Sequence, residues 1–322
     1  MNLREKIDNS PMGVYQWAIV LMAAVMNFLD GFDVLAIAFT ATNISKDFGL
    51  SKTEFGMLVS AGLIGMVVGS MVLAPLADKF GRRPILLLSV AFSAVGLAVS
   101  GFSTTSEILA FSRILTGLGV GGILVGTNVI TSEYSSKKWR SFAISVYAAG
   151  FGIGAMIGGI IAKSLQSAYS WHAVYFAGAA MTAVVFVVLW IWLPESIDYL
   201  NSKQPQNAKA RLNKIAHKLG FAGEWELTEK RAEKAVKLPI TALFSQKYLR
   251  STLLLWLSFF AIMFCFYFIS SWTPALLKEA GMTVEESINV GMMISLGGAA
   301  GSLVYGLIAS RWSARSVLML FT

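Results

Sequence analysis

Eight long apolar runs constrain the fold of this chain more than any other feature of its sequence. A helix needs about 20 apolar residues to cross the hydrocarbon core of a bilayer, and each run is about that long or longer. The sequence therefore predicts an all-α integral membrane protein. The predicted spans are 15–40, 54–77, 84–103, 107–131, 141–163, 172–193, 250–273 and 286–309.

The composition supports this class and argues against a metal site or an enzyme. Hydrophobic residues make up 56% of the chain and charged residues only 14%, compared with about a quarter charged in soluble domains. The single cysteine, Cys265, lies in an apolar run, and His172 and His217 are far apart. No disulfide framework, metal site or bound cofactor is therefore expected. Because no nucleophile is paired with a base, no catalytic residue is predicted.

Most of the 26 Lys and Arg residues lie on one side of the predicted membrane. The opposite side carries only Lys46, Lys52, Lys163 and Lys278. Basic loops face the cytoplasm, so the N-terminus and the long loop after the sixth span are predicted to be cytoplasmic. The membrane is predicted to be the cell inner (plasma) membrane. The net charge of +8 follows from this topology. It therefore gives no reason to expect nucleic acid as a partner.

The spans and loops divide the chain into two halves. Residues 1–193 would form a six-helix half, 194–249 a cytoplasmic central loop, and 250–322 a partial second half with two spans and the start of a third. The segment 74–86 resembles the segment 306–318, which indicates parallel halves related by an axis along the membrane normal. Because the last apolar run is too short to span, the sequence is expected to be cut off.

The central loop contains an amphipathic pattern. Leu212, Ile215 and Leu219 recur at helical spacing and predict a helix lying near the membrane surface. The alternative is a solvated helix whose charges, such as those at Glu229 and Lys230, stabilise it along its surface.

Four short motifs resemble those of the major facilitator superfamily of transporters. "LADKFGRR" (76–83) resembles the signature loop after the second helix, "SEYSSKKWR" (132–140) the charged loop after the fourth, and "LPES" (193–196) the motif after the sixth. "DGFD" (30–33) resembles the aromatic acid:proton symporter family, whose members import benzoate-like acids and hydroxybenzoates. The resemblance covers the whole chain. It implies a major-facilitator-type helical bundle and proton-coupled import of an aromatic or related organic acid by alternating access.

The resemblance also implies a latch between the two halves at the cytoplasmic surface. Charge pairs there would stabilise the outward-open state, and the alternative is that these charges only set the topology. The residues assigned to the conformational latch are Asp78, Lys79, Gly81, Arg82, Arg83, Glu133 and Arg140.

Three charged residues lie inside predicted spans, where each costs roughly 2.5–3.5 kcal/mol on insertion scales. Asp30 and Asp33 are in the first span, and Arg113 is in the fourth. The helical rise places Asp33 about 10 Å and Arg113 about 9 Å below the outer ends of their spans. Because such charges normally face a wet cavity or a bundle interior, we expect all three to share one cavity. The alternative is a salt bridge that only holds the helices together.

These charges suggest how an organic acid and a proton would be transported together. Arg113 can bind a carboxylate through two parallel hydrogen bonds, whereas an ionised aspartate nearby repels it. Burial and a neighbouring like charge both favour the protonated aspartate. The proton and the anion therefore strengthen each other's binding. Protons are the expected coupling ion, and an aromatic carboxylate is the expected small-molecule partner within the lipid bilayer.

Four further residues are assigned to substrate or proton binding. Asn27 precedes Asp30 by about one helical turn, Asn128 lies on the predicted face of Arg113, and Tyr147 and Tyr267 are aromatic side chains that can form hydrogen bonds. Another carrier, such as a drug exporter or a sugar carrier, and an inactive truncated membrane protein are the alternatives.

Small residues at four-residue spacing also predict close helix packing. They include Ala61, Gly65 and Gly69, and Gly150, Gly154 and Gly158.

Overall fold

The structure is a computed structural model, and it describes residues 2–227, 243–312, 316–317 and 319. In these residues the regular secondary structure is helical, and eight helices are long and apolar enough to cross a membrane. This confirms the predicted all-α membrane fold. The long helices are α2 (Val14–Asp47), α3 (Lys52–Phe80), α4 (Arg82–Gly101), α5 (Ser106–Tyr134), α6 (Arg140–Ala168), α7 (Trp171–Trp192), α10 (Leu249–Glu279) and α11 (Val284–Ala309), and the short ones are α1 (Leu3–Asn9), α8 (Ile197–Lys203) and α9 (Ala208–Lys218).

Side-chain caps determine where several of these helices begin. Asn2 caps α1, Ser51 caps α3 and Thr283 caps α11, and in each case a glutamate three residues later completes a capping box. A capping box satisfies backbone N–H groups that the first helical turn leaves unpaired. Because these polar ends continue the helices, most spans extend beyond the apolar runs that predicted them.

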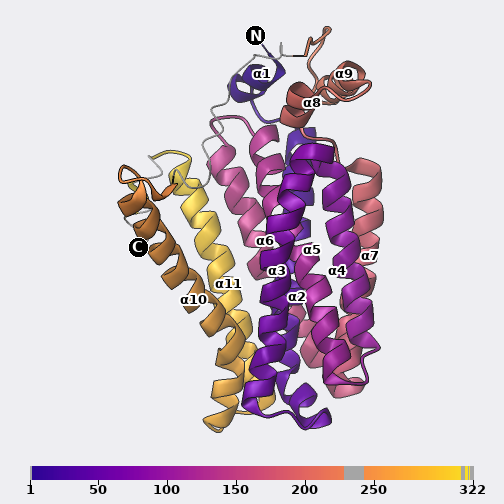
Figure 1. The fold of residues 1–322 in the computed structure, drawn as a ribbon, viewed down its shortest axis with the longest axis vertical. Helices are drawn as coiled ribbons and strands as arrows, with labels where there is room; N and C mark the ends of the chain where they lie inside the picture. Colours follow the sequence, from indigo (N-terminus) through magenta and orange to yellow (C-terminus); the bar gives the residue numbers. More distant parts are fainter. Residues whose placement is uncertain (1, 228–242, 313–315, 318, 320–322) are drawn as a thin grey trace.

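Helices α2 to α7 form a bundle, and α10 and α11 lie beside it (Figure 1). α11 packs along α6, and α10 contacts both α11 and α2. Figure 1 shows that α10 meets the bundle at the end opposite α1. Toward the end that carries α1, α10 leans away from the bundle. We call these the far end and the α1 end. At the far end, ion pairs join Lys52 to Glu279 of α10 and Lys163 to Glu285 of α11.

The short helices gather at the α1 end and cover the apolar residues of the central loop (Figure 1). Leu212 and Ile215 of α9 lie in one hydrophobic cluster with Leu3 and Ile7 of α1. The apolar face of α9 therefore packs against protein, a contact that neither sequence interpretation included. Its partner α1 has only 7 residues, and so short a helix shows little periodicity in a sequence. The charged segment at Glu229 lies outside the described residues.

Candidate functional site

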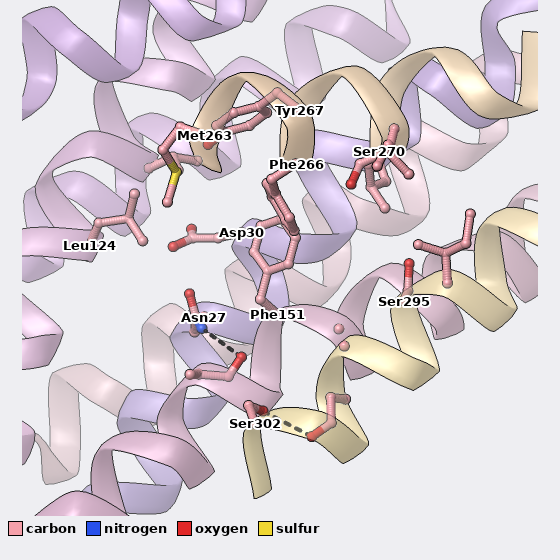
Figure 2. Close-up of a pocket in the computed structure, with 18 of the residues that line it drawn as sticks. Asn27, Asp30, Leu124, Phe151, Met263, Phe266, Tyr267, Ser270, Ser295 and Ser302 are labelled. Atoms are coloured by element: carbon pink, nitrogen blue, oxygen red, sulfur yellow. Dashed lines mark hydrogen bonds between the residues drawn. The ribbon is translucent and has the colours of Figure 1, made fainter. Parts of the chain in front are cut away.

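A cavity of about 600 Å³ lies between the bundle and the two helices beside it (Figure 2). Helices α2, α3, α5 and α6 line one side, and α10 and α11 line the other. The walls are largely apolar, so they suit a ligand with an apolar body and few polar groups. The larger apolar side chains that line it are Leu35, Met66, Leu124, Phe151, Phe259, Met263, Phe266 and Ile294.

Asp30 is a buried carboxyl group in the wall of this cavity. It is 1% exposed, and its Oδ2 has no hydrogen-bond partner. Among the described residues, no Lys, Arg or His forms an ion pair with it. A buried carboxylate without a cation or a donor is strongly unfavourable, so such a group takes up a proton instead. A proton-binding role for Asp30 stays a prediction.

Asn27 lies one turn before Asp30 and also lines the cavity. It is 4% exposed, and its amide nitrogen donates to the backbone carbonyls of Tyr147 and Ala148 on α6. Its Oδ1 is buried without a hydrogen-bond partner. The cavity wall therefore contains two neighbouring oxygen atoms, Asn27 Oδ1 and Asp30 Oδ2, that have no hydrogen-bond partner among the described residues.

Asp33 and Arg113 form a buried ion pair between α2 and α5. Arg113 Nη1 donates to Asp33 Oδ1 at 2.6 Å, and Nη2 donates to Asp33 Oδ2 at 3.3 Å and to the Asp33 backbone carbonyl at 3.1 Å. The two side chains are 2% and 4% exposed. Gly62 of α3 lies beside the guanidinium, and a Cβ there would be in ordinary van der Waals contact with Nη2, at 3.6 Å. In such a bidentate ion pair, each buried charge forms hydrogen bonds with the other in place of water.

The structure does not place the two aspartates and Arg113 in one cavity. Asp30 lines the large cavity, whereas Asp33 and Arg113 line an adjoining void of about 20 Å³. The reason is rotation along the helix, because three residues turn Asp33 about 60° away from Asp30. Met66 and Tyr267 line both spaces, and the Tyr267 hydroxyl lies 3.9 Å from the Met66 sulfur. Val120 also lines both spaces, and these three residues lie between the ion pair and the large cavity.

The remaining residues assigned from the sequence divide into two groups. Tyr147 and Tyr267 line the cavity, whereas Asn128 is exposed and does not. Sequence reasoning missed Phe151 of α6 and Phe266 of α10, which contribute aromatic rings to the cavity wall. The aromatic residues of the seventh span were too numerous for their helical positions to single out the ones that face a ligand.

Close helix packing holds the DGFD segment in place. A Cβ added at Gly31 would overlap the backbone carbonyl of Phe151, and one added at Gly154 would overlap that of Phe28. Gly150 likewise leaves room for the carbonyl of Ala24. Helices α2 and α6 therefore touch through their backbones, as small residues at four-residue spacing allow.

A second group of charges lies at the α1 end. Glu133, buried at the end of α5, accepts hydrogen bonds from the Ser196 hydroxyl and the Ile197 backbone N–H, both at 2.9 Å. Its Oε1 lies 3.7 Å from Arg82 Nε, and Arg82 forms an ion pair with Asp78 at 3.0 Å. These contacts join α3, α4, α5 and the segment after α7. A latch role toward the second half stays a prediction.

Glu195 of the LPES motif holds the beginning of α4 and was not assigned from the sequence. Its Oε1 accepts from the backbone N–H groups of Arg82 at 2.8 Å, Arg83 at 3.1 Å and Ser196 at 2.9 Å. A carboxylate at a helix N-terminus satisfies unpaired N–H groups and the helix dipole. Gly81 has φ +110°, and a Cβ there would lie 2.6 Å from the same carboxylate. Glycine is therefore required at this position.

Arg140 and Glu133, which share a sequence motif, do not pair with each other. Arg140 forms its ion pair with Asp8 of α1 and donates to the carbonyl of Ser132 at 3.2 Å, whereas Glu133 pairs with the α3–α4 segment. Lys79 is exposed. The sequence motif contained the right charges, but the partner of Arg140 comes from a helix that was not predicted.

Replacing Glu195 with alanine is expected to lower the free energy of unfolding by about 1–2 kcal/mol, because the first N–H groups of α4 lose their acceptor. Glu195→Gln keeps one acceptor oxygen and is expected to cost less. Thermal unfolding of the purified protein measures both. Glu224→Ala is the matched control, because Glu224 is largely exposed and pairs only with a surface lysine. An equal effect of Glu195→Ala and Glu224→Ala would contradict the capping role.

The helical bundle with a central cavity and paired charges defines a membrane transporter, and the chain belongs to the major facilitator superfamily. The family model, described as Major Facilitator Superfamily, matches residues 22–322. The gallate transporter of Pseudomonas putida is 32% identical over 99% of this chain and 71% of its own length. The 4-hydroxybenzoate transporter PcaK of the same species is 32% identical over 100% of this chain and 72% of its own length.

A solved structure of the xylose transporter XylE from E. coli has the same fold. It matches with a TM-score of 0.70 over 93% of this chain and 72% of that chain, at 17% sequence identity. This likeness supports the arrangement of helices and carries no argument about the substrate. The chain is thus a multi-pass membrane protein closely related to aromatic acid transporters.

Proposed function

We propose that this protein imports an aromatic carboxylate together with protons, by alternating access. The observation that carries the proposal is Asp30, a buried carboxyl group in the wall of an apolar cavity that forms no ion pair with any described residue. The relatives named above, and the benzoate transport protein of Acinetobacter baylyi at 25% identity, bear names of aromatic acid carriers.

The cavity offers different surfaces to the apolar ring and to the polar carboxylate of such a substrate. The ring lies against the aromatic wall formed by Phe151 and Phe266, whose ring centroids are 5.7 Å apart. An ionised Asp30 would repel the substrate anion in this low-dielectric space. Protonation removes that repulsion, so the proton and the anion favour each other's binding. This reciprocity is the physical basis of symport.

The ion pair supplies the positive charge for the carboxylate. Asp33 keeps Arg113 charged and buried beside the cavity, behind Met66 and Tyr267. When these two side chains move apart, the substrate carboxylate competes with Asp33 for the guanidinium. The exchange of one carboxylate for the other on Arg113 links substrate binding to the packing of α2 against α5. A salt bridge that the substrate can replace acts as a switch.

Protons also offset the membrane potential. Moving an anion into a negative interior costs roughly 2.3 kcal/mol per 100 mV, and one accompanying proton cancels that cost. The α1 end faces the cytoplasm, because Lys79, Arg82, Arg83 and Arg140 lie there. The membrane is the cell inner (plasma) membrane. In this orientation the proton gradient and the potential both act toward uptake once a second proton is carried.

Replacing Asp30 with asparagine is expected to reduce accumulation of labelled 4-hydroxybenzoate at least about tenfold, because each 1.4 kcal/mol of lost coupling energy is a factor of ten. Asparagine resembles the protonated aspartic acid in shape and carries no titratable group. Exchange of labelled for unlabelled substrate should therefore continue. Uptake by cells that express the protein, with and without a protonophore, measures the first effect, and counterflow in proteoliposomes measures the second.

Asp47→Asn is the matched control, because Asp47 lies on the same helix and accepts from the Trp171 indole outside the cavity, at 2.6 Å. It should leave accumulation unchanged. Accumulation that persists in Asp30→Asn, or uptake that ignores the protonophore, would contradict proton coupling through Asp30. Cells that express the protein and take up no aromatic acid would contradict the proposed function itself.

A further inference from the structure

The hydrogen bonds of Asn27 leave only its oxygen free to face a ligand. The two atoms beside its Nδ2 are backbone carbonyl oxygens, of Tyr147 at 2.9 Å and Ala148 at 3.4 Å. A carbonyl oxygen only accepts, so the atom between them must be the amide nitrogen. The orientation of the amide therefore follows from its partners. Figure 2 shows this bond as a dashed line, with the amide oxygen on the side of Asp30.

This oxygen needs a hydrogen-bond donor. It is buried and unpaired within the part of the chain that the structure describes, and an unsatisfied buried acceptor is costly. The carboxylate of an aromatic acid cannot pair with it, because an ionised carboxylate has acceptors only. A hydroxyl or amino group on the ring can, because each donates a hydrogen bond.

We propose that Asn27 determines specificity by selecting aromatic acids that carry a hydroxyl or amino group on the ring, which donates to Asn27 Oδ1. The inference rests on the proposed function and narrows its substrate class from aromatic carboxylates in general to those with a hydrogen-bond donor on the ring. Asn27 takes part in this selection by direct contact, while the carboxylate at the other end of the ring points toward Arg113.

Asp30 completes the site for a hydroxyl. Three residues along an α-helix correspond to a rise of about 4.5 Å, so the two side chains reach the cavity one above the other. A protonated Asp30 donates to the hydroxyl oxygen while the hydroxyl donates to Asn27. A ring without a hydroxyl or amino group would leave Asn27 Oδ1 unpaired.

Four para-substituted benzoates test the inference on the purified protein. 4-Hydroxybenzoate and 4-aminobenzoate can donate to Asn27, whereas 4-methoxybenzoate and 4-fluorobenzoate cannot. The two donors are expected to bind at least about tenfold more tightly than the other two, because a ligand without a donor leaves the buried acceptor unpaired. Isothermal titration of each ligand gives the affinities, and the ratio between donors and non-donors is the readout.

Two leucine substitutions on α2 show whether the ratio depends on Asn27. Asn27→Leu removes the acceptor and is expected to bring the ratio of affinities close to one, even if overall affinity or stability falls. Asn43→Leu is the matched control, because Asn43 donates to Gln166 at 2.7 Å and does not line the cavity. It is expected to leave the ratio as in the wild type.

The outcomes separate this inference from the proposed function. Equal affinities for all four ligands in the wild type, or a ratio unchanged in Asn27→Leu, would overturn the selection by Asn27 and leave aromatic acid transport intact. A preference for donors that is lost equally in Asn43→Leu would also overturn it. Failure of all four acids to bind would overturn both proposals together.

Discussion

Replacing Arg113 with methionine is expected to abolish uptake and to lower the free energy of unfolding by about 3–5 kcal/mol, the cost of removing one partner of a buried ion pair. The Asp33 side chain is 2% exposed, and Arg113 provides its ion pair. Without the guanidinium, a buried carboxylate is left with no cation, and the substrate carboxylate loses its binding partner. Thermal unfolding of the purified protein and uptake of labelled 4-hydroxybenzoate measure the two effects separately.

The double variant Asp33→Asn/Arg113→Met distinguishes a transport role from a structural one. It removes both charges, so stability is expected to recover most of the loss seen in Arg113→Met, since replacing a whole buried pair is often nearly neutral. Uptake is expected to stay lost, because the substrate carboxylate still finds no cation. Recovery of uptake in the double variant would contradict our mechanism and support a salt bridge that only holds α2 against α5.

The burial of Asp30, Asp33 and Arg113 could be predicted because each interrupts a long apolar run. Their pairing could not, because it depends on how α2 and α5 are rotated against each other. Spacing in the sequence places Asp30 and Asp33 about one turn apart, so either aspartate could pair with Arg113. The packed helices decide that Asp33 takes the guanidinium and Asp30 faces the cavity.

The α1 end shows a second limit of the sequence. The charges of Glu133 and Arg140 were visible in their motif, but their partners come from distant segments. Asp8, the partner of Arg140, lies on α1, a helix too short to show a clear period. Glu195 shows the same limit, because it accepts from backbone N–H groups, which no side-chain pattern reveals. Long-range contacts of this kind follow from the tertiary fold and leave little trace in local sequence.

Replacing Gly31 with alanine is expected to reduce uptake by about 100-fold, a size of loss that a 1 Å misplacement of a binding group can cause. The added Cβ would overlap the backbone carbonyl of Phe151, so α2 and α6 must move apart. Backbone atoms cannot yield as a flexible side chain does, and overpacking of this kind costs about 1–3 kcal/mol of stability. Because Gly31 lies in the segment between Asp30 and Asp33, the same movement displaces the proton site and the ion pair. Uptake and thermal unfolding report the two losses.

Gly297→Ala in α11 is the matched control. A Cβ at Gly297 has no neighbour within 4 Å, and alanine is favoured over glycine inside a helix by about 1 kcal/mol. This variant is therefore expected to keep its uptake and to be at least as stable as the wild type. If Gly31→Ala behaved in the same way, contact between the backbones of α2 and α6 would not be what positions the two aspartates. If only Gly31→Ala lost uptake, the glycine of the DGFD segment would act by letting the two helices meet, and the aspartates on either side of it would depend on that contact for their separate roles.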